Sequence, residues 1–155
     1  MSTNMEKNDD QYFMQLAIAE ARKGKAEGEL PFANVIVRNN EVIATNHCQE
    51  GRLKDVTTHS ELLTVSDACR QLKTNNLSDC TIYCTNEPCL MCASAIFQAK
   101  IGKLVIGADR SDIAHIARPR KLKVEDLIND LGYKAEVVSG VLREEVIALF
   151  KDIKK

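Results

Sequence analysis

From Ser60 onward the chain alternates between short strand-like apolar runs and longer segments whose apolar residues recur at helical spacing. Strands that are joined through helices pair in parallel, because each connection must cross a face of the sheet. This part of the chain therefore predicts a parallel sheet covered by helices. The expected helices are 60–72, 89–100, 124–131 and 142–153, and the expected strands are 81–85, 104–108 and 135–140.

The N-terminal part adds one helix and one hairpin. Residues 12–23 carry their apolar side chains on one helical stripe. The apolar runs 35–37 and 42–44 flank an Asn-Asn pair, which tolerates the positive φ angles of a tight turn. We therefore predict an α/β fold, a three-layer α/β/α sandwich around a mixed five-stranded sheet whose last strands are parallel. Residues 1–155 would form a single domain.

Length and charge limit the class of protein. The chain has 155 residues, 45% of them hydrophobic, which is enough for one packed domain. Its formal net charge of −1 gives little overall attraction to a polyanion, so no nucleic-acid partner is expected. No apolar run approaches the roughly 18 residues that cross a bilayer, and no signal-peptide pattern is present. We expect a cytoplasmic protein without a membrane partner, in which six cysteines favour metal binding or catalysis over disulfides.

Four residues carry the candidate chemistry. His59 and Glu61 lie at the start of one expected helix, and Cys89 and Cys92 lie at the start of another. The i,i+3 spacing puts both sulfurs on one face of a helical turn, and a helix N-terminus favours thiolates. One imidazole and two thiolates leave a fourth tetrahedral position of Zn²⁺ open to water, whose pKa zinc lowers to about 7. Glu61 is then free to carry protons as the catalytic residue.

The surrounding sequence is similar to that of known enzymes. H-x-E followed by P-C-x-x-C is the signature of zinc deaminases. The string TNEPCLMCASAI resembles the T-x-E-P-C-x-M-C-x-x-A-I run of guanine deaminases and tRNA adenosine deaminases, and PFANVIV and IGKLVIGA resemble two of their strands. The resemblance covers roughly residues 10–110. It implies the cytidine/deoxycytidylate deaminase-like superfamily, in the branch of guanine, tRNA adenosine and cytosine deaminases, with zinc on His59, Cys89 and Cys92.

Simpler interpretations of the same residues stay open. Cys80, Cys84, Cys89 and Cys92 could form a structural four-cysteine site, although the even spacing of the first two within a strand also fits core positions. The histidine could be a helix cap, and the glutamate could be a first-turn carboxylate favoured by the helix dipole.

The candidate substrate-binding residues depart from the family pattern. Relatives place an asparagine that hydrogen-bonds the base eleven residues before the zinc histidine, where this chain has Cys48. A thiol is a weak donor and acceptor, so Asn46 or His47 could take over this contact after a loop shift. Asn34 could add a side-chain amide or lie at a strand edge. Phe32 could line the base pocket or belong to the core.

Two features beyond the zinc motif bear on substrate choice. Asp112 has the spacing of an acidic residue that binds the amino group in guanine deaminases, whereas tRNA adenosine deaminases have a basic residue there. An exposed loop carboxylate is the alternative. The basic cluster Arg118, Arg120, Lys121 and Lys123 could contact phosphate or tRNA, although such a run is more often a solvated loop.

These features predict a zinc-dependent hydrolytic deaminase of a small heterocyclic amine, with a guanine-like ring favoured and cytosine second. A tRNA-specific adenosine deaminase is the alternative with the same chemistry. A non-catalytic, zinc-stabilised binding module is the alternative of another class. The resemblance also implies a homodimer, to which four apolar residues near the zinc motif could contribute: Leu90, Met91, Ile96 and Phe97.

Overall fold

A mixed five-stranded sheet forms the centre of the computed structural model, which describes residues 3–132 and 134–154. The strands are β1 (Ala33–Arg38), β2 (Glu41–His47), β3 (Thr81–Asn86), β4 (Lys103–Ala108) and β5 (Glu136–Val138). Their order across the sheet is β2-β1-β3-β4-β5. β1 pairs antiparallel with β2 and β3, whereas β3, β4 and β5 are parallel. The predicted mixed sheet with parallel last strands is confirmed.

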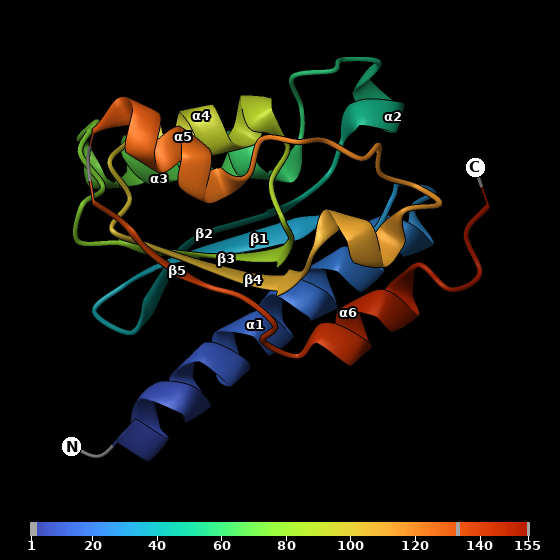
Figure 1. Ribbon diagram of the computed structural model, residues 1–155, viewed down its shortest axis with the longest axis horizontal. Helices are drawn as coiled ribbons and strands as arrows, with labels where there is room; N and C mark the ends of the chain where they lie inside the picture. Colours follow the sequence, from blue (N-terminus) through green and yellow to red (C-terminus); the bar gives the residue numbers. More distant parts are fainter. Residues whose placement is uncertain (1–2, 133, 155) are drawn as a thin grey trace.

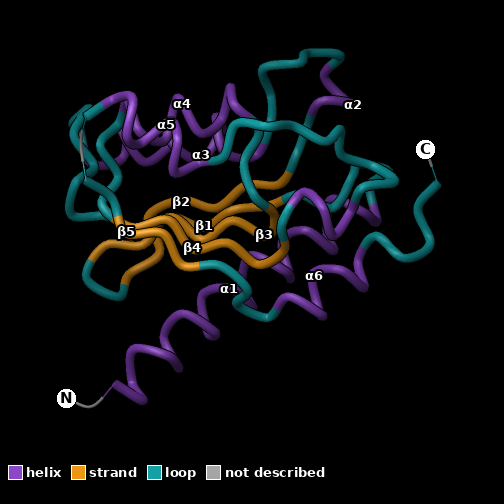
Figure 2. The backbone as a smooth tube through the Cα atoms, viewed as in Figure 1, coloured by secondary structure: helices purple, strands orange, loops and turns teal. Residues whose placement is uncertain are grey.

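Helices cover both faces of this sheet. They are α1 (Thr3–Ala26), α2 (Glu50–Leu53), α3 (Ser60–Leu72), α4 (Leu90–Gln98), α5 (Val124–Leu131) and α6 (Arg143–Leu149), with a short 3₁₀ helix η1 (Arg110–Ile113). α1 and α6 lie on one face, and α3, α4 and α5 lie on the other (Figure 1). The strands form a separate layer between the two sets of helices (Figure 2). The three-layer α/β/α arrangement is therefore confirmed.

Each face of the sheet has its own hydrophobic core. Val35 is buried against α1, while its neighbour Ile36 is buried against the helices of the opposite face. This division follows from the alternation of side chains along a strand. Because both faces are covered, the central strands are almost continuously apolar, as the sequence pattern indicated. The buried Phe13 and Ala17 confirm the predicted apolar stripe of α1.

The hairpin between β1 and β2 turns where predicted. Asn39 and Asn40 have φ angles of 53° and 62°. Positive φ at both central residues matches the twist of a two-residue hairpin, and asparagine tolerates it better than other non-glycine residues. The hairpin brings the end of β2 back beside the start of β1, where Ala33 is opposite His47.

Element limits and short helices differ from the prediction. α1 begins at Thr3 rather than at residue 12, and the added segment has no apolar stripe by which the sequence could have marked it as a helix. α2 and η1 were not predicted, since one turn is too short to display a helical period. α6 ends at Leu149 rather than at residue 153.

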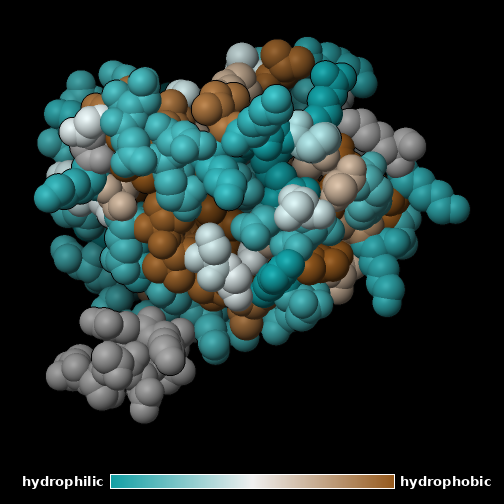
Figure 3. Space-filling model, viewed as in Figure 1, coloured by the Kyte–Doolittle hydropathy of each residue, from teal (hydrophilic) through white to brown (hydrophobic). Residues whose placement is uncertain are grey.

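The surface of the described residues mixes hydrophilic and hydrophobic side chains. On the face drawn in Figure 3, hydrophilic residues surround smaller hydrophobic areas. Within the described residues, no helix combines the length and the apolar character needed to cross a bilayer.

Candidate metal centre and substrate pocket

The metal-ligand candidates lie at the starts of two neighbouring helices. His59 is the residue that immediately precedes α3, with an extended backbone (φ −67°, ψ 151°). Cys89 has the equivalent position before α4, with φ −67° and ψ 168°. Cys92 follows in the first turn of α4 and is fully buried. Because α3 and α4 pack against each other, their N-terminal ends bring the three side chains together.

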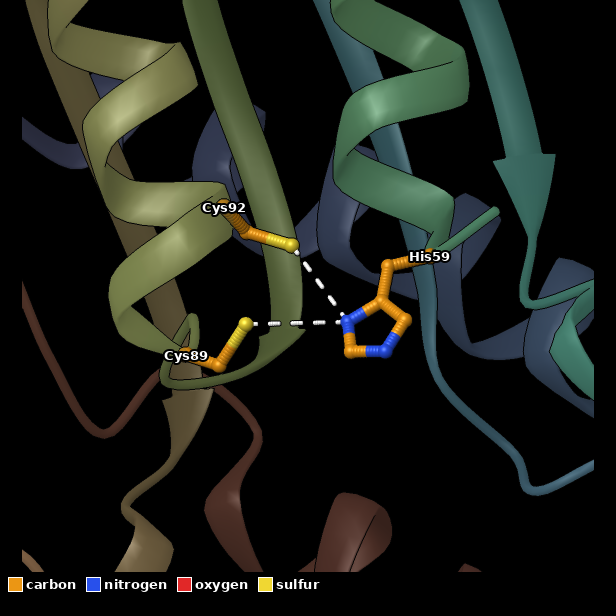
Figure 4. Close-up of side chains that lie close together, drawn as sticks. All are labelled: His59, Cys89 and Cys92. Atoms are coloured by element: carbon orange, nitrogen blue, oxygen red, sulfur yellow. Dashed lines mark hydrogen bonds between the residues drawn. The ribbon is translucent and has the colours of Figure 1, made fainter. Parts of the chain in front are cut away.

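The three side chains have the geometry of a metal site. His59 Nδ1 lies 3.6 Å from Cys89 Sγ and 3.5 Å from Cys92 Sγ (Figure 4). The three candidate ligand atoms all lie within 4.8 Å of one another. Tetrahedral zinc, with bonds of about 2.0 Å to nitrogen and 2.3 Å to sulfur, would separate these atoms by roughly 3.5 Å. The donor set and its spacing therefore fit Zn²⁺.

The charges in this cluster also suit metal binding. The hydrogen bond with Cys92 lowers the pKa of the Cys89 thiol to about 4, and His59 adds to this effect. Cys89 in turn raises the pKa of His59 to about 9 and raises the pKa of Cys92. Near neutral pH these shifts give a Cys89 thiolate beside a protonated His59 and a Cys92 thiol, and a metal cation displaces both of these protons when it binds.

The four-cysteine alternative does not fit this geometry. Cys80 and Cys84 are buried in the core between the sheet and α4, and neither belongs to the cluster around His59. Burial raises the pKa of the Cys80 thiol to about 11 and also raises that of Cys84. These two thiols are therefore core residues rather than ligands.

Glu61 lies in the first turn of α3, beside the cluster. Its side chain is only 8% exposed and lines the same pocket as His59 and Cys89. Burial raises the pKa of Glu61, while the Ser60 hydroxyl donates a hydrogen bond of 2.8 Å to Glu61 Oε1. A carboxyl group whose pKa is raised toward neutrality can both accept and return a proton.

A pocket of about 80 Å³ opens at this cluster. Two of the predicted substrate residues, Phe32 and Cys48, lie in its wall. Five residues in the wall were not predicted as site residues, and three of them are charged: Glu50, Glu87 and Arg110. The complete lining is Leu30, Phe32, Cys48, Glu50, His59, Ser60, Glu61, Glu87, Cys89 and Arg110.

Asn34, Asn46 and His47 do not line this pocket. Asn34 is buried within β1, where its side chain hydrogen-bonds Cys84. Asn46 donates from Nδ2 to Asp67 at 2.9 Å. His47 is held by the carboxylates of Glu20 in α1 and of Glu27 just after α1. The geometry therefore does not support their predicted contacts with the base.

Asp112 is engaged elsewhere as well. Its carboxylate accepts hydrogen bonds from the Arg143 guanidinium, with 2.9 Å from Nε, and from the backbone nitrogen of Asp109 at 2.9 Å. Arg143 lowers the pKa of Asp112. Asp112 thus caps η1 through its hydrogen bond with Asp109 and links η1 to the start of α6 through Arg143. It does not line the zinc-side pocket.

Comparisons with known proteins agree with this site. Residues 7–108 match the family described as the cytidine and deoxycytidylate deaminase zinc-binding region. The chain belongs to this zinc-dependent deaminase family. The deaminase is 37% identical over 150 residues to a tRNA-specific adenosine deaminase of Bacillus subtilis (strain 168), covering 94% of this chain and 91% of the relative.

Solved structures give the same family and fold. The deaminase is 32% identical, with a TM-score of 0.78, to a structure from a study of A-to-I editing by tRNA:A34 deaminases at the wobble position of transfer RNA, covering 89% of this chain and 98% of that one. A structure described as a guanine deaminase from Nitrosomonas europaea has a TM-score of 0.81 at 24% identity, covering 92% and 82%. At that identity the likeness shows the fold alone.

The family assignment confirms a hydrolytic deaminase with zinc as its metal, and it corrects one expectation. The prediction of no nucleic-acid partner is wrong, because the B. subtilis relative, matched along nearly all of both chains, is tRNA-specific. Net charge averages over the whole surface, whereas a nucleic acid is held by local groups.

Proposed function

We propose that this deaminase hydrolyses the amino group of adenosine in tRNA, giving inosine and ammonia. The observation that carries this proposal is the 37% identity to a tRNA-specific adenosine deaminase along 94% of the chain. A second observation removes the main reason for preferring guanine. Asp112, the acidic residue on which that preference rested, is paired with Arg143 and lies outside the pocket.

The residues of the pocket divide the chemistry among them. His59, Cys89 and Cys92 would hold the metal, with its fourth position open. Zinc, when bound, supplies a water of lowered pKa and a positive charge beside the developing oxyanion. Glu61 accepts the proton of that water on its carboxylate. It then delivers this proton to the ring nitrogen next to the reacting carbon, and it passes a second proton, from the added hydroxyl group, to the amino group that leaves as ammonia.

The walls of the pocket exclude water from the reacting base. Phe32 and Leu30 provide apolar surface in this small pocket, beside His59 and Glu61. An adenine ring must therefore leave the base stack to enter, as in other enzymes that react on a base. A strand with unstacked bases, such as an anticodon loop, is the RNA form that fits this requirement.

The test uses the zinc-loaded protein and a tRNA anticodon stem-loop with adenosine at the wobble position. We expect inosine to form in this RNA, and no ammonia to be released from free guanine, cytosine or adenosine. A stem-loop with guanosine at the same position is the matched control. Ammonia from free guanine without inosine in the RNA would overturn the proposal and favour the small-molecule alternative.

A homodimer remains part of the proposal. Leu90 and Met91, which are 38% and 37% exposed at the start of α4, offer apolar surface for it. Ile96 and Phe97 are buried in the core, so they do not contribute. Light scattering after size exclusion should give the mass of two chains, and a monomer mass would remove this part. A cytoplasmic location, shared with tRNA, also remains a prediction.

A further inference from the structure

A second and larger cavity adjoins the zinc-side pocket. Its volume is about 480 Å³, and Glu87 and Arg110 line both cavities. Most of the remaining wall comes from η1 and the segment that leads from η1 into α5, including Arg120 and Lys123. The shared residues place the larger cavity next to the base pocket. A group attached to the reacting base would therefore extend into it.

Two arginines lie in this wall, and Glu87 forms an ion pair with only one of them, Arg120. Glu87 Oε2 accepts a hydrogen bond of 2.9 Å from Arg120 Nη2, and Glu87 Oε1 accepts one of 3.2 Å from the backbone nitrogen of Arg110. Arg120 and Glu87 have side chains that are only 14% and 18% exposed. Burial lowers the pKa of Arg110, and the nearby charge of Arg120 lowers it further. One positive charge of the pair is therefore not neutralised by Glu87.

The hydrogen-bonding capacity of both guanidinium groups is also incompletely used. Arg110 Nη2 donates to the carbonyl oxygen of Arg118 at 2.7 Å, and Arg120 Nε donates to that of Leu122 at 2.9 Å. Among the described residues, Arg110 Nε and Arg120 Nη1 are buried without a hydrogen-bond partner. A buried, unpartnered donor on a charged group is costly, and an anion is the ligand that removes this cost. Guanidinium groups pair with phosphate through two parallel hydrogen bonds, so phosphate is the anion that best matches this pair.

The other polar groups of the wall agree with an anion. Lys123 is exposed at the cavity, next to the start of α5, where backbone N–H groups of a first helical turn favour negative charge. Two carboxylates besides Glu87 lie in the wall. Asp109 accepts a hydrogen bond from the first turn of η1, and Glu125 is exposed. Neither carboxylate pairs with the two arginines through an ion pair of the described residues.

We propose that this cavity binds a phosphate group of the substrate beside the reacting nucleoside, through Arg110, Arg120 and Lys123. That this phosphate belongs to the backbone of an RNA strand rests on the proposed function. A terminal phosphate of a mononucleotide has the same chemistry, and the experiment separates the two. The basic cluster of the sequence thus divides into residues that line the cavity, Arg120 and Lys123, and residues that do not, Arg118 and Lys121.

The test compares Lys123→Gln with Lys121→Gln in the full-length, zinc-loaded protein. Both lysines are exposed and lie two positions apart in one loop, but only Lys123 lines the cavity. Binding of the anticodon stem-loop is measured by fluorescence anisotropy across a series of salt concentrations. Lys123→Gln should weaken binding and lower the slope of log K against log salt by about one, while Lys121→Gln should leave the slope unchanged.

Arg120→Gln extends the test to the buried pair, with zinc content and thermal melting as checks on folding. It should weaken RNA binding by about tenfold. A stem-loop whose phosphates flanking the adenosine are replaced with uncharged methylphosphonates should bind the wild type about tenfold more weakly, and Arg120→Gln should add no further loss. Equal effects on the charged and uncharged RNA would overturn the proposal, as would equal slopes for the two lysine variants.

Failure of the proposed function has a different outcome. If the wild type forms no inosine, the RNA assignment of the activity is wrong, while the binding comparison still tests the phosphate site. In the same variants, binding of adenosine 5′-monophosphate is compared with that of adenosine. A loss of mononucleotide binding without a loss of RNA binding would assign the site to a terminal phosphate. Unchanged binding of both the RNA and the mononucleotide in these variants would overturn the site.

Discussion

His59 Nε2 lies 3.3 Å from Glu50 Oε2, on the side of the imidazole ring opposite to the two sulfurs that face Nδ1. A carboxylate on the second nitrogen fixes the tautomer and the orientation of a metal-binding histidine. Glu50 is itself positioned by α2, whose backbone nitrogens at Gly51 and Arg52 donate to the Glu29 carboxylate at 2.9 and 2.6 Å.

Glu50→Gln should therefore weaken zinc binding. The amide removes the charge that orients and polarises the imidazole, and loss of such a partner typically lowers metal affinity by about 10- to 100-fold. Competition with a chelator measures the affinity directly, without reference to activity. Glu41→Gln, which removes an exposed carboxylate from β2, is the control. Equal zinc affinity in the wild type and both variants would mean that Glu50 does not support His59.

Cys48→Asn should increase activity on the stem-loop. Cys48 lies in the pocket wall at the position where relatives carry an asparagine that hydrogen-bonds the base. An amide adds a donor and an acceptor that the thiol lacks, which corresponds to a gain of about tenfold in kcat/KM. Cys48→Ser controls for loss of the thiol. A folded, zinc-loaded Cys48→Asn protein with lower kcat/KM would show that the base is bound without this contact.

Asp112→Asn should affect stability rather than substrate choice. The substitution weakens the bond that ties η1 to Arg143 of α6, so the melting temperature should fall by a few degrees. Because Arg143 lowers the pKa of Asp112, this stabilisation is present above the ordinary pKa of aspartate and is lost as the pH falls through the lowered value. We expect kcat/KM to change by less than about twofold. A loss of 100-fold or more at unchanged stability would restore Asp112 as a substrate residue.

The buried His47 should make stability depend on pH. Burial opposes its charge, but hydrogen bonds of 2.5 Å to Glu20 and 2.8 Å to Glu27 outweigh that effect and raise its pKa above 6.5. Gln49 and Gly24 are the other neighbours of the ring. Since the folded state holds this proton more tightly, its contribution is complete below about pH 6.5 and is lost as the pH rises through the raised pKa.

Denaturant unfolding of the wild type and of His47→Gln, from about pH 6 to about pH 9, measures this contribution. The wild type should lose stability across this range, and the variant should lose less. Parallel curves for the two proteins would assign the pH dependence to other groups.

The sequence predicted the features that depend on local pattern. His59, Cys89 and Cys92 lie at the starts of two helices that the sequence pattern predicted. Their clustering needed only that these two helices lie side by side. The alternation of strands and helices after Ser60 likewise determined the parallel strands. Glu50 was missed because α2 is a single turn without a buried residue, and nothing in its sequence marks a helix.

Tertiary pairing explains the other differences. Asp112 has the spacing of a substrate-binding carboxylate, but its side chain turns to Arg143, a residue far along the chain whose position only the folded structure gives. Arg110 and Arg120 are also apart in the sequence. In the folded structure both contact Glu87, Arg110 through its backbone nitrogen and Arg120 through its guanidinium group. Glu87 itself immediately precedes the P-C-x-x-C string and belongs to the longer TNEPCLMCASAI run, which is the local signal that could have identified it.

The most direct measurement of the central claim is the turnover of Glu61→Gln on the stem-loop, made alongside its zinc content. The glutamine keeps the shape of the buried side chain and the hydrogen bond with Ser60, but it cannot carry a proton. We predict one zinc per chain, unchanged RNA binding and inosine formation slower by a factor of about 10² to 10⁴. A variant that retains zinc and forms inosine at the wild-type rate would contradict the account.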